Sequence, residues 1–151
     1  MRHPFPFIFL LLTFCSCRTT PKVNQQEEER LQLMEVDRQF STRSAEAGLK
    51  NAYLDFIDST ATLLRPGNMP LTGGDAIDII CRNNDAGVTM TWEPKGCSLA
   101  KSGELGYTWG IYTLKELPTD SLTLGTYLNI WKKQEGGNWK LVANSANQGV
   151  E

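Results

Sequence analysis

The sequence predicts an α+β fold in which three helical segments precede a curved antiparallel sheet. Between Glu27 and about residue 85, three segments carry apolar residues at spacings of three and four, which is the period of an α-helix, and one short strand precedes the third. After Gly87 the pattern alternates between apolar and polar residues, and turn residues separate the alternating runs. Helices followed by a meander of strands are typical of a sheet that wraps over helices.

The first helix is expected to begin at Glu27 and to end at Gly48. Acidic residues at its start suit the helix dipole, and glycine commonly ends a helix. Its apolar stripe consists of Leu33, Val36, Phe40 and Ala47. Asp37 lies one step off this stripe, so it is either a catalytic candidate or a residue of a solvated helix face or a structural hydrogen bond.

Two shorter helices and a strand follow. Residues 49–57 form the second helix, whose inward residues are Leu49, Tyr53, Phe56 and Ile57. A strand at 60–65 stops at Pro66 and Gly67. The third helix follows a Gly-Gly pair, and its apolar side carries Ile77, Ile80 and Cys81. The glycine pair is not a phosphate-binding loop, because no Gly-Lys-Ser/Thr follows it.

The strand segments expected after Gly87 are residues 88–95, 97–102, 104–117, 121–135 and 138–148. The last two join at Gly136 and Gly137 in a hairpin. Pairing across that turn places Trp131 opposite Val142 and Asn129 opposite Asn144, and it separates the hairpin into two faces.

One face is rich in aromatic and amide groups, and the other is aliphatic. The amide face carries Tyr127, Asn129, Trp131, Val142, Asn144 and Ala146. The aliphatic face carries Leu122, Leu124, Leu128, Ile130, Leu141 and Ala143. Either the amide face lines a ligand pocket and the aliphatic face packs in a dimer, or the aliphatic face is the core and the amide face is wet.

The preceding strand is expected to pair Thr113 with Thr126. This register adds Thr108, Gly110 and Tyr112 to the amide face, and it leaves open volume at Gly110 opposite Asn129. A slip of one residue instead brings Tyr107, Trp109 and Ile111 to that face.

The first 16 residues have the pattern of a secretory leader. Arg2 is a short basic region, and the apolar run from Phe5 to Phe14 is too short to span a bilayer. The stretch resembles a bacterial lipoprotein signal, in which a cysteine after a small residue becomes the lipid-bearing first residue. Cys17 follows Ser16 and fits, whereas Cys15 follows Phe14 and does not. A plain signal peptide cut nearby is the alternative.

This leader divides the chain into a signal peptide at 1–16, a flexible tether at 17–27 and a domain at 28–148. We expect a lipid-anchored protein of the bacterial cell envelope, on its periplasmic or surface side, or a secreted protein if no lipid is attached. The envelope permits a disulfide between Cys81 and Cys97, and two buried apolar cysteines are the alternative.

Composition excludes several functions. The net charge of −2 gives no basic field for phosphate backbones, so we expect no nucleic-acid partner. The only histidine is His3, which lies in the leader, so a mature chain has no Ser-His-Asp or Cys-His machinery. No metal and no cofactor are expected.

Three stretches together resemble an NTF2-like domain and, more narrowly, the SnoaL-like and DUF4440 group. They are "LKNAYLDFIDSTATLLRPGNMPLTGGDAI", "SGELGYTWGIYTL" and "GTYLNIWKKQEGGNWKLVAN". The resemblance covers residues 28–148 and implies a cone, a strongly bent antiparallel sheet that helices close around a pocket. It implies no single activity, because the fold hosts isomerases, dehydratases, cyclases, hydrolases and binding or assembly modules.

The resemblance also implies which residues face the pocket. The predicted ligand-pocket residues are Tyr53, Arg65, Trp92, Thr108, Tyr112, Tyr127, Asn129, Trp131 and Asn144. Asn129 matches a pocket acid of ketosteroid-isomerase relatives, and Asn144 stands where many DUF4440-like sequences have aspartate. An amide can hydrogen-bond an oxyanion but releases no proton, which weakens an acid–base mechanism. Core packing is the alternative for the aromatic residues, and a rim salt bridge is the alternative for Arg65.

Three functions follow from these residues. The leading prediction is a membrane-anchored domain whose pocket binds a small, partly apolar molecule. An isomerase or dehydratase on a small carbonyl substrate is the alternative, with Asp37 as base and Asn129 with a tyrosine as oxyanion donors. The third is a module that forms a homodimer through the outer sheet face and tethers a partner at the membrane.

Overall fold

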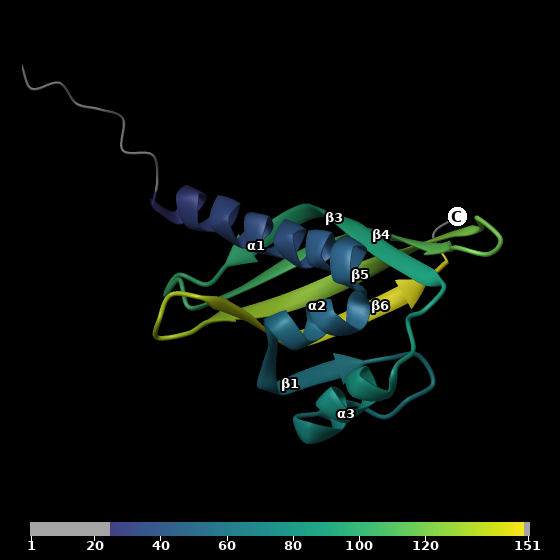
Figure 1. The fold of residues 1–151 in the computed structure, drawn as a ribbon. Coiled ribbons are helices and arrows are strands. Elements are labelled where there is room, and N and C mark those ends of the chain that lie inside the picture. The colour runs from purple at the N-terminus through teal and green to yellow at the C-terminus, as the bar shows by residue number, and fades with distance from the viewer. Residues whose placement is uncertain (1–24, 150–151) are drawn as a thin grey trace, which may run out of the picture.

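The computed structural model describes residues 25–149, and Figure 1 shows their arrangement. The elements in chain order are α1 (Gln25–Ala47), α2 (Leu49–Phe56), β1 (Ile57–Leu64), β2 (Leu71–Thr72), α3 (Gly74–Arg82), β3 (Val88–Leu99), β4 (Leu105–Glu116), β5 (Leu122–Lys133) and β6 (Trp139–Gln148). The predicted signal peptide and the predicted lipidation site Cys17 lie outside the described residues. Helix α1 begins at Gln25, so residues 25–27, at the end of the predicted tether, are helical.

The strands form one sheet in the order β2-β1-β6-β5-β4-β3. The four long strands β3 to β6 pair antiparallel, as predicted for a meander. Strand β1 is the exception, because it runs parallel to β6 and antiparallel to the short β2. The α+β prediction, with helices on one side of a curved sheet, is confirmed.

Helix α1 crosses the concave side of the sheet and covers its outer strand β3 (Figure 1). Two serines of α1 bond to backbone groups on β3: the Trp92 N–H donates to Ser41 Oγ at 2.7 Å, and Ser44 Oγ donates to the Met90 carbonyl at 2.7 Å. An edge strand otherwise presents unpaired backbone groups, and these serines satisfy two of them. Polar residues on the buried side of α1 therefore fix the helix to the sheet.

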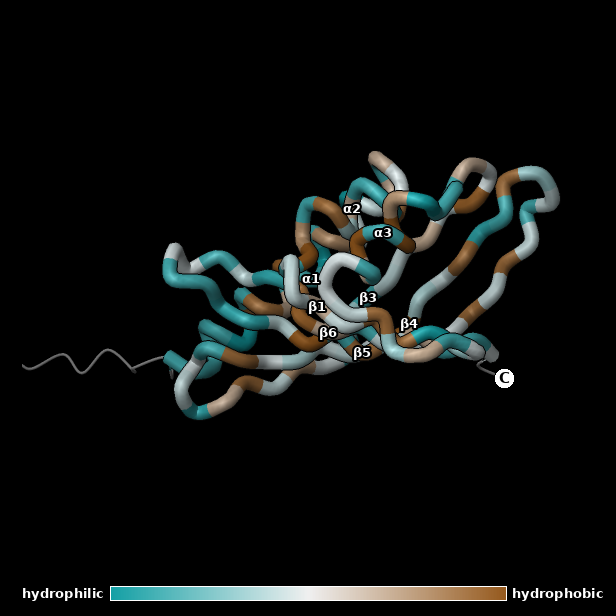
Figure 2. The backbone as a smooth tube through the Cα atoms, turned by 90° about the horizontal axis from the view of Figure 1, so that it is seen from below, coloured by the Kyte–Doolittle hydropathy of each residue, from teal (hydrophilic) through white to brown (hydrophobic). Residues whose placement is uncertain are grey.

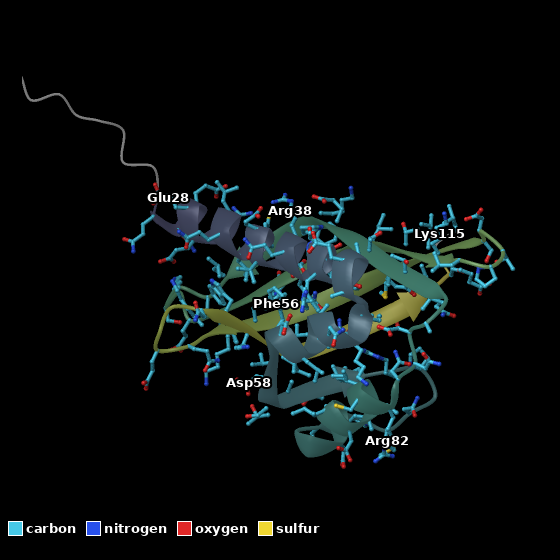
Figure 3. All side chains as sticks on the ribbon, viewed as in Figure 1. Glu28, Arg38, Phe56, Asp58, Arg82 and Lys115 are labelled. Atoms are coloured by element: carbon cyan, nitrogen blue, oxygen red, sulfur yellow. The ribbon has the colours of Figure 1, made fainter. Side chains whose placement is uncertain are left out.

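Aromatic rings fill the space between α1 and the sheet. The Phe40 ring lies 4.6 Å from the Trp92 ring and 6.0 Å from the Trp131 ring, centroid to centroid, and both contacts are edge-to-face. Phe56 from α2 lies 5.1 Å from Phe40 on the same criterion. Figure 3 shows Phe56 in the middle of the molecule, whereas Glu28, Arg82 and Lys115 lie at its outer edges. The core is therefore aromatic at the crossing of α1, α2 and the sheet.

The sheet has two unlike faces, as the alternation predicts, and the tube in Figure 2 shows hydrophobic and hydrophilic segments alternating along the strands. The amide face is concave and buried under the helices, so the interpretation of a wet amide face is wrong. The outward residues of β4 and β5 are large and exposed, Trp109 at 49% and Leu122 at 65%. We call the following set the outer apolar face: Leu105, Tyr107, Trp109, Ile111, Leu122, Leu124 and Leu128.

Apart from the register between β4 and β5, three local predictions are wrong. A bulge in β6 pairs Trp131 with Leu141, so Leu141 is fully buried and Val142 is not the residue opposite Trp131. The predicted strands at 88–95 and 97–102 form one strand, β3, with an irregularity between Pro94 and Gly96.

The third wrong prediction places Cys81 on the apolar side of the third helix. Cys81 lies instead on the exposed side of α3, whereas Cys97 is buried, and both thiols are free. Helix α3 covers β1 with Ala76 and Ile80 instead. Within residues 25–149, no helix combines the length and the apolar character that crossing a membrane requires.

The β4–β5 register differs from the prediction by two residues. Thr113 pairs with Leu124 rather than with Thr126, and Gly110 lies opposite Tyr127 rather than Asn129. Thr108, Gly110 and Tyr112 still belong to the amide face, because a shift of two residues preserves the face of every side chain. The alternative slip of one residue is excluded, since Tyr107, Trp109 and Ile111 point outward.

Candidate functional site

A cavity of about 640 Å³ opens between α2, α3 and the concave side of the sheet. We call it the mouth cavity. Helix α2 contributes Leu49, Lys50 and Tyr53, the segment after β1 contributes Arg65, and α3 contributes Ile79 and Ile80. The sheet contributes Leu63, Met90, Tyr112, Leu114, Ala146 and Gln148. Its wall is mostly apolar, as in small-molecule sites, and its polar side chains include those of Lys50, Tyr53, Arg65, Arg82, Gln148 and three asparagines, Asn68, Asn83 and Asn84.

The loop after α3 closes one side of the mouth cavity. Asp85 Oδ2 accepts a hydrogen bond from the Lys50 backbone N–H at 2.8 Å, which ties this loop to the first turn of α2. Lys50 Nζ donates to the Cys81 carbonyl at 2.7 Å. Helices α2 and α3 are therefore held side by side, and the cavity lies between them and the sheet.

Arg65 directs its guanidinium into this cavity from the end of β1. Its Nη1 donates to Asn144 Oδ1 at 2.6 Å and to the Leu64 carbonyl at 2.9 Å, and its Nη2 donates to Tyr53 Oη at 2.9 Å. The Tyr53 hydroxyl donates to Asn144 Oδ1 at 2.9 Å. Burial raises the pKa of Tyr53 above its usual range, so the phenol stays neutral.

A directed chain of hydrogen bonds runs from Arg65 into the interior. Asn144 Nδ2 donates to Asn129 Oδ1 at 2.6 Å, and Asn129 Nδ2 donates to Asp37 Oδ1 at 2.9 Å. A guanidinium can only donate, so it fixes the carbonyl end of Asn144 toward itself, and that choice fixes the amide of Asn129 in turn. Both asparagines that the sequence singled out are therefore links between Arg65 and Asp37.

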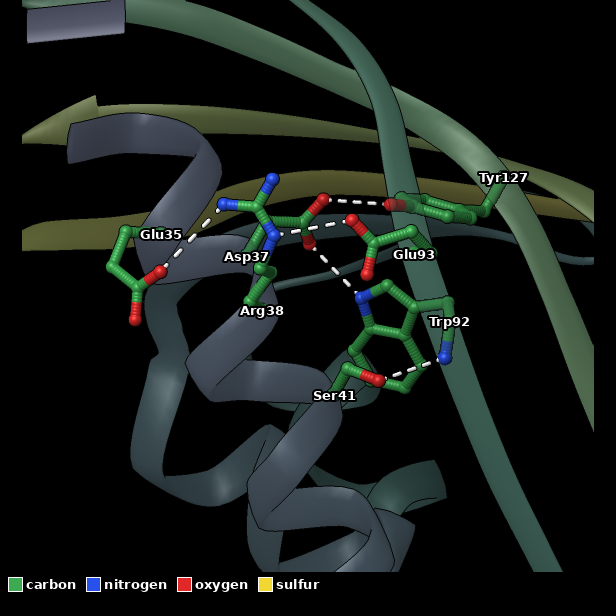
Figure 4. A network of polar contacts seen from close by, with 7 residues as sticks. All are labelled: Glu35, Asp37, Arg38, Ser41, Trp92, Glu93 and Tyr127. Atoms are coloured by element: carbon green, nitrogen blue, oxygen red, sulfur yellow. Dashed lines mark hydrogen bonds and ion pairs between the residues drawn. The ribbon is translucent and has the colours of Figure 1, made fainter. Parts of the chain in front are cut away.

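Asp37 is the inner end of this chain and is fully buried. Besides Asn129, Trp92 Nε1 donates to its Oδ1 at 3.0 Å and Tyr127 Oη donates to its Oδ2 at 2.8 Å (Figure 4). Burial raises the pKa of this carboxyl above its usual range, although the hydrogen bonds it accepts act in the opposite direction. The carboxyl is therefore hydrogen-bonded inside the core, and the interpretation of a solvated helix face is wrong.

The space around Asp37 is filled. The void bordered by Trp92, Tyr127, Asn129 and Asn144 measures about 10 Å³, which is room for one water molecule at most. The neighbouring pair is closed as well, because Trp131 Nε1 donates to Thr108 Oγ1 at 2.9 Å and both residues are fully buried. We call this buried region the deep end, and it consists of Asp37, Trp92, Thr108, Tyr127, Asn129 and Trp131.

Two glycines make this close packing possible. Tyr127 lies opposite Gly110 and Tyr112 lies opposite Gly125 across the β4–β5 ladder. A Cβ at Gly110 would meet the Tyr127 ring at 2.9 Å and the Glu93 carbonyl even closer, and a Cβ at Gly125 would meet the Tyr112 ring. The open volume predicted at Gly110 is therefore occupied by a tyrosine ring from the next strand.

The nine predicted pocket residues all lie on the concave side, but they divide between two regions. Tyr53, Arg65 and Tyr112 line the mouth cavity. The others belong to the deep end or border its small void, and they are Trp92, Thr108, Tyr127, Asn129, Trp131 and Asn144. Packing, rather than contact with an open cavity, is what the structure shows for these six.

The prediction missed much of the cavity wall, including Leu49, Met90 and Ile79. Apolar spacing indicated that Leu49 faces inward, but no local signal says which inward residues meet an open space. The way in which α2 and α3 pack against each other and against the sheet decides which inward residues meet the cavity. This packing depends on residues far apart in the chain. Within residues 25–149, no three His, Cys, Asp or Glu side chains lie close enough together to hold a metal ion.

Comparisons with known proteins concern the fold. No protein-family model matches the chain, and no curated protein matches it. Among solved structures, a ketosteroid isomerase-like protein from Erwinia carotovora atroseptica is similar with a TM-score of 0.60 at 16% identity, over 80% of this chain and 97% of that one. An NTF2-like superfamily protein from Salmonella enterica has a TM-score of 0.61 at 10% identity, over 83% and 94%.

The CaMKII hub of S. rosetta is a third similar structure, with a TM-score of 0.63 at 16% identity over 80% of this chain and 96% of that one. At identities this low, structural similarity establishes the fold and leaves the activity open. The narrower resemblance to SnoaL-like and DUF4440 proteins stays a prediction. The helix order, the curved six-stranded sheet and these similar structures together show that the chain has the NTF2-like fold.

Proposed function

We propose that the chain binds a small, partly apolar molecule in the mouth cavity. The observation that carries this proposal is a cavity of about 640 Å³ with an apolar wall and a fixed guanidinium. This volume lies within the range of about 300–1,000 Å³ that is typical of small-molecule sites. Leu49, Leu63 and Met90 supply apolar contacts, and Arg65 supplies a polar anchor.

The deep end supports binding over acid–base chemistry. A general base must reach the proton that it abstracts, directly or through one water. Asp37 is fully buried behind Trp92, Tyr127 and Asn129, and each of these three side chains donates to its carboxyl. This geometry disfavours the isomerase or dehydratase alternative with Asp37 as base.

A neutral fluorescent probe tests the proposal. N-phenyl-1-naphthylamine brightens in apolar sites, and we expect saturable binding of one probe per chain. Ala146→Trp places an indole in the mouth cavity and should abolish the signal, whereas Ala45→Trp, the same change on the exposed side of α1, should leave it. Circular dichroism checks that both variants fold. Equal probe binding by both variants would place the site elsewhere and overturn the proposal.

The membrane anchor is a further part of this proposal and is supported by the leader sequence alone. A lipid on Cys17 would hold the domain at a membrane of the cell envelope. Cys17→Ala should move the folded domain from the membrane fraction to the soluble fraction. A variant that stays in the membrane and still incorporates a palmitate probe would show that another residue carries the lipid.

A second candidate function is assembly, and the outer apolar face favours it. Seven large residues of β4 and β5 are exposed there, which is more than single scattered apolar residues on a monomer. We propose a homodimer through this face. Trp109→Glu should convert a dimer to a monomer in light scattering, whereas Arg43→Glu on α1 should not. A monomeric unsubstituted chain would end this proposal and leave the mouth cavity unaffected.

A further inference from the structure

We infer that the molecule bound in the mouth cavity is an amphipathic organic anion, with one carboxylate on an apolar body. This inference rests on the proposed function and specifies its ligand. The carboxylate would meet Arg65, and the apolar body would lie against Leu49, Leu63, Ile80 and Met90.

The charge of the cavity wall points to an anion. Among the described residues that line it, three are cationic, namely Lys50, Arg65 and Arg82, and none is an aspartate or a glutamate. The whole chain has a net charge of −2, so the wall has the opposite sign to the protein. A concave wall of one sign attracts ligands of the other sign.

Arg65 is the cation best placed for a buried contact. Arg82 is exposed and paired with Asp78 at 3.0 Å, and Lys50 Nζ already donates to the Cys81 carbonyl. Arg65 is half-buried, and no carboxylate within residues 25–149 lies in salt-bridge range of it. A guanidinium beside apolar side chains with no protein counter-charge favours an anionic ligand.

The hydrogen bonds of Arg65 leave donors for that ligand. A guanidinium has five N–H groups, and partners in the described part of the chain accept from three of them: two on Nη1 and one on Nη2. The Nε–H and the second N–H of Nη2 remain. Two N–H groups match the two oxygens of a carboxylate, which guanidinium groups commonly bind in a bidentate manner.

The directed hydrogen-bond chain holds the guanidinium in place before a ligand arrives. Asn144 and Tyr53 bind one side of it, and its Cζ lies 5.8 Å from the centroid of the Tyr53 ring. Asn144 is fixed in turn by Asn129 and Asp37. A preorganised donor loses little conformational entropy on binding, so it adds to affinity.

A matched pair of ligands tests the inference on the purified chain. Decanoate and 1-decanol share their apolar body and differ in the charged group, and titration calorimetry gives a dissociation constant for each. We expect decanoate to bind about tenfold or more tightly than 1-decanol, since hydrogen bonds to a charged group contribute this much. Inorganic phosphate, which has no apolar body, should not bind measurably.

Three variants assign the preference to Arg65. Arg65→Gln should reduce the ratio of the two constants to near one, and Arg65→Lys should retain part of it, because the charge remains without the paired N–H groups. Arg43→Gln is the control for the same change of charge outside the cavity, and it should keep the full ratio. Thermal unfolding of each variant shows whether the fold is intact.

The outcomes separate the two proposals. Binding of both ligands with equal constants, unchanged in Arg65→Gln, would overturn the anion inference and leave a small-molecule site. No binding of decanoate, 1-decanol or the neutral fluorescent probe would overturn the proposed function itself. Tight binding of phosphate alone would also overturn the inference, because the apolar wall would then play no part.

Discussion

The deep end and the mouth cavity are two parts of the same concave space, and they differ in how that space is filled. At the deep end, rings and amides leave a void of about 10 Å³, whereas the mouth leaves about 640 Å³. Within the described residues, no buried side-chain nitrogen or oxygen lacks a hydrogen-bond partner. Polar residues at the deep end are therefore satisfied by one another, and polar residues at the mouth retain donors.

This difference separates structural polar groups from functional ones. Asn129 and Asp37 have the residue types of a catalytic site, but their hydrogen bonds connect α1 to the sheet. Arg65 is held by the same chain of hydrogen bonds through Asn144, but its guanidinium also borders the open mouth cavity. Being polar and on the concave face is not enough for a role in binding, because the residue must also reach unoccupied volume.

Truncation of a core side chain should show the largest difference in stability between the two regions. Phe40→Ala removes a ring that touches Tyr53, Phe56, Trp92 and Trp131, and we expect it to lower the free energy of unfolding by about 3–5 kcal/mol. Ile79→Ala, at the half-exposed wall of the mouth, should cost less than about 1 kcal/mol. Urea denaturation measures both, and equal losses would mean that the mouth is packed like the deep end.

A smaller effect is expected from an added methyl group at the deep end. Gly110→Ala should lower the free energy of unfolding by about 1–3 kcal/mol, because its Cβ meets the Tyr127 ring and the Glu93 carbonyl. Gly136→Ala, in the exposed β5–β6 turn where a Cβ meets nothing within 4 Å, is the control and should change little. A tolerated Gly110→Ala would show that the deep end can expand.

Removing the buried charge should have the smallest effect, and it should depend on pH. Asp37→Asn keeps an acceptor for Trp92 and Asn129, and its new amide can donate to Tyr127. The pKa of Asp37 is raised in the folded state, so the folded state binds more protons than the unfolded one above about pH 4. The unsubstituted chain should therefore lose stability relative to Asp37→Asn as the pH rises from about 4 to the raised pKa of Asp37 in the folded state.

Asp58 provides a control of opposite sign for this measurement. Hydrogen bonds from Thr60 hold the pKa of its carboxyl below the usual range, so its contribution to stability is present at neutral pH and is lost as the pH falls. Asp58→Asn should flatten the acid side of the stability profile. Urea denaturation between about pH 2 and pH 7 measures both variants, because the contribution of Asp58 is lost below about pH 4. A gain by the unsubstituted chain over Asp37→Asn with rising pH would contradict a raised pKa.

Alternation along β4 and β5 predicted the faces of the sheet correctly even where the register was wrong. The error in the β4–β5 pairing was two residues, and the side-chain period of a strand is also two, so Thr108 and Tyr112 kept their face. The bulge in β6 had the opposite effect, because one extra residue brought Leu141 to the buried face opposite Trp131. Period-two patterns therefore predict faces reliably until a bulge interrupts them.

The candidate site was predicted less well, for a different reason. The prediction was correct for three residues that line the mouth cavity, Tyr53, Arg65 and Tyr112. Each could be predicted because its place depends only on the face or the end of its own helix or strand. The fully buried position of Asp37 could not be predicted, because it depends on Trp92 from β3 and on Tyr127 and Asn129 from β5, which are far from Asp37 along the chain. The stripe of α1 alone placed Asp37 only near the boundary of the apolar face.

The sequence by itself determined the order of helices and strands and the two unlike faces of the sheet, because both follow from periodicity within single segments. Only the tertiary structure decided where the concave space is filled and where it is open. The Tyr127 ring fills the space over Gly110 at the deep end, whereas a cavity stays open at the mouth between α2, α3 and the sheet. Volume is set by contacts between distant residues, so no local pattern specifies it.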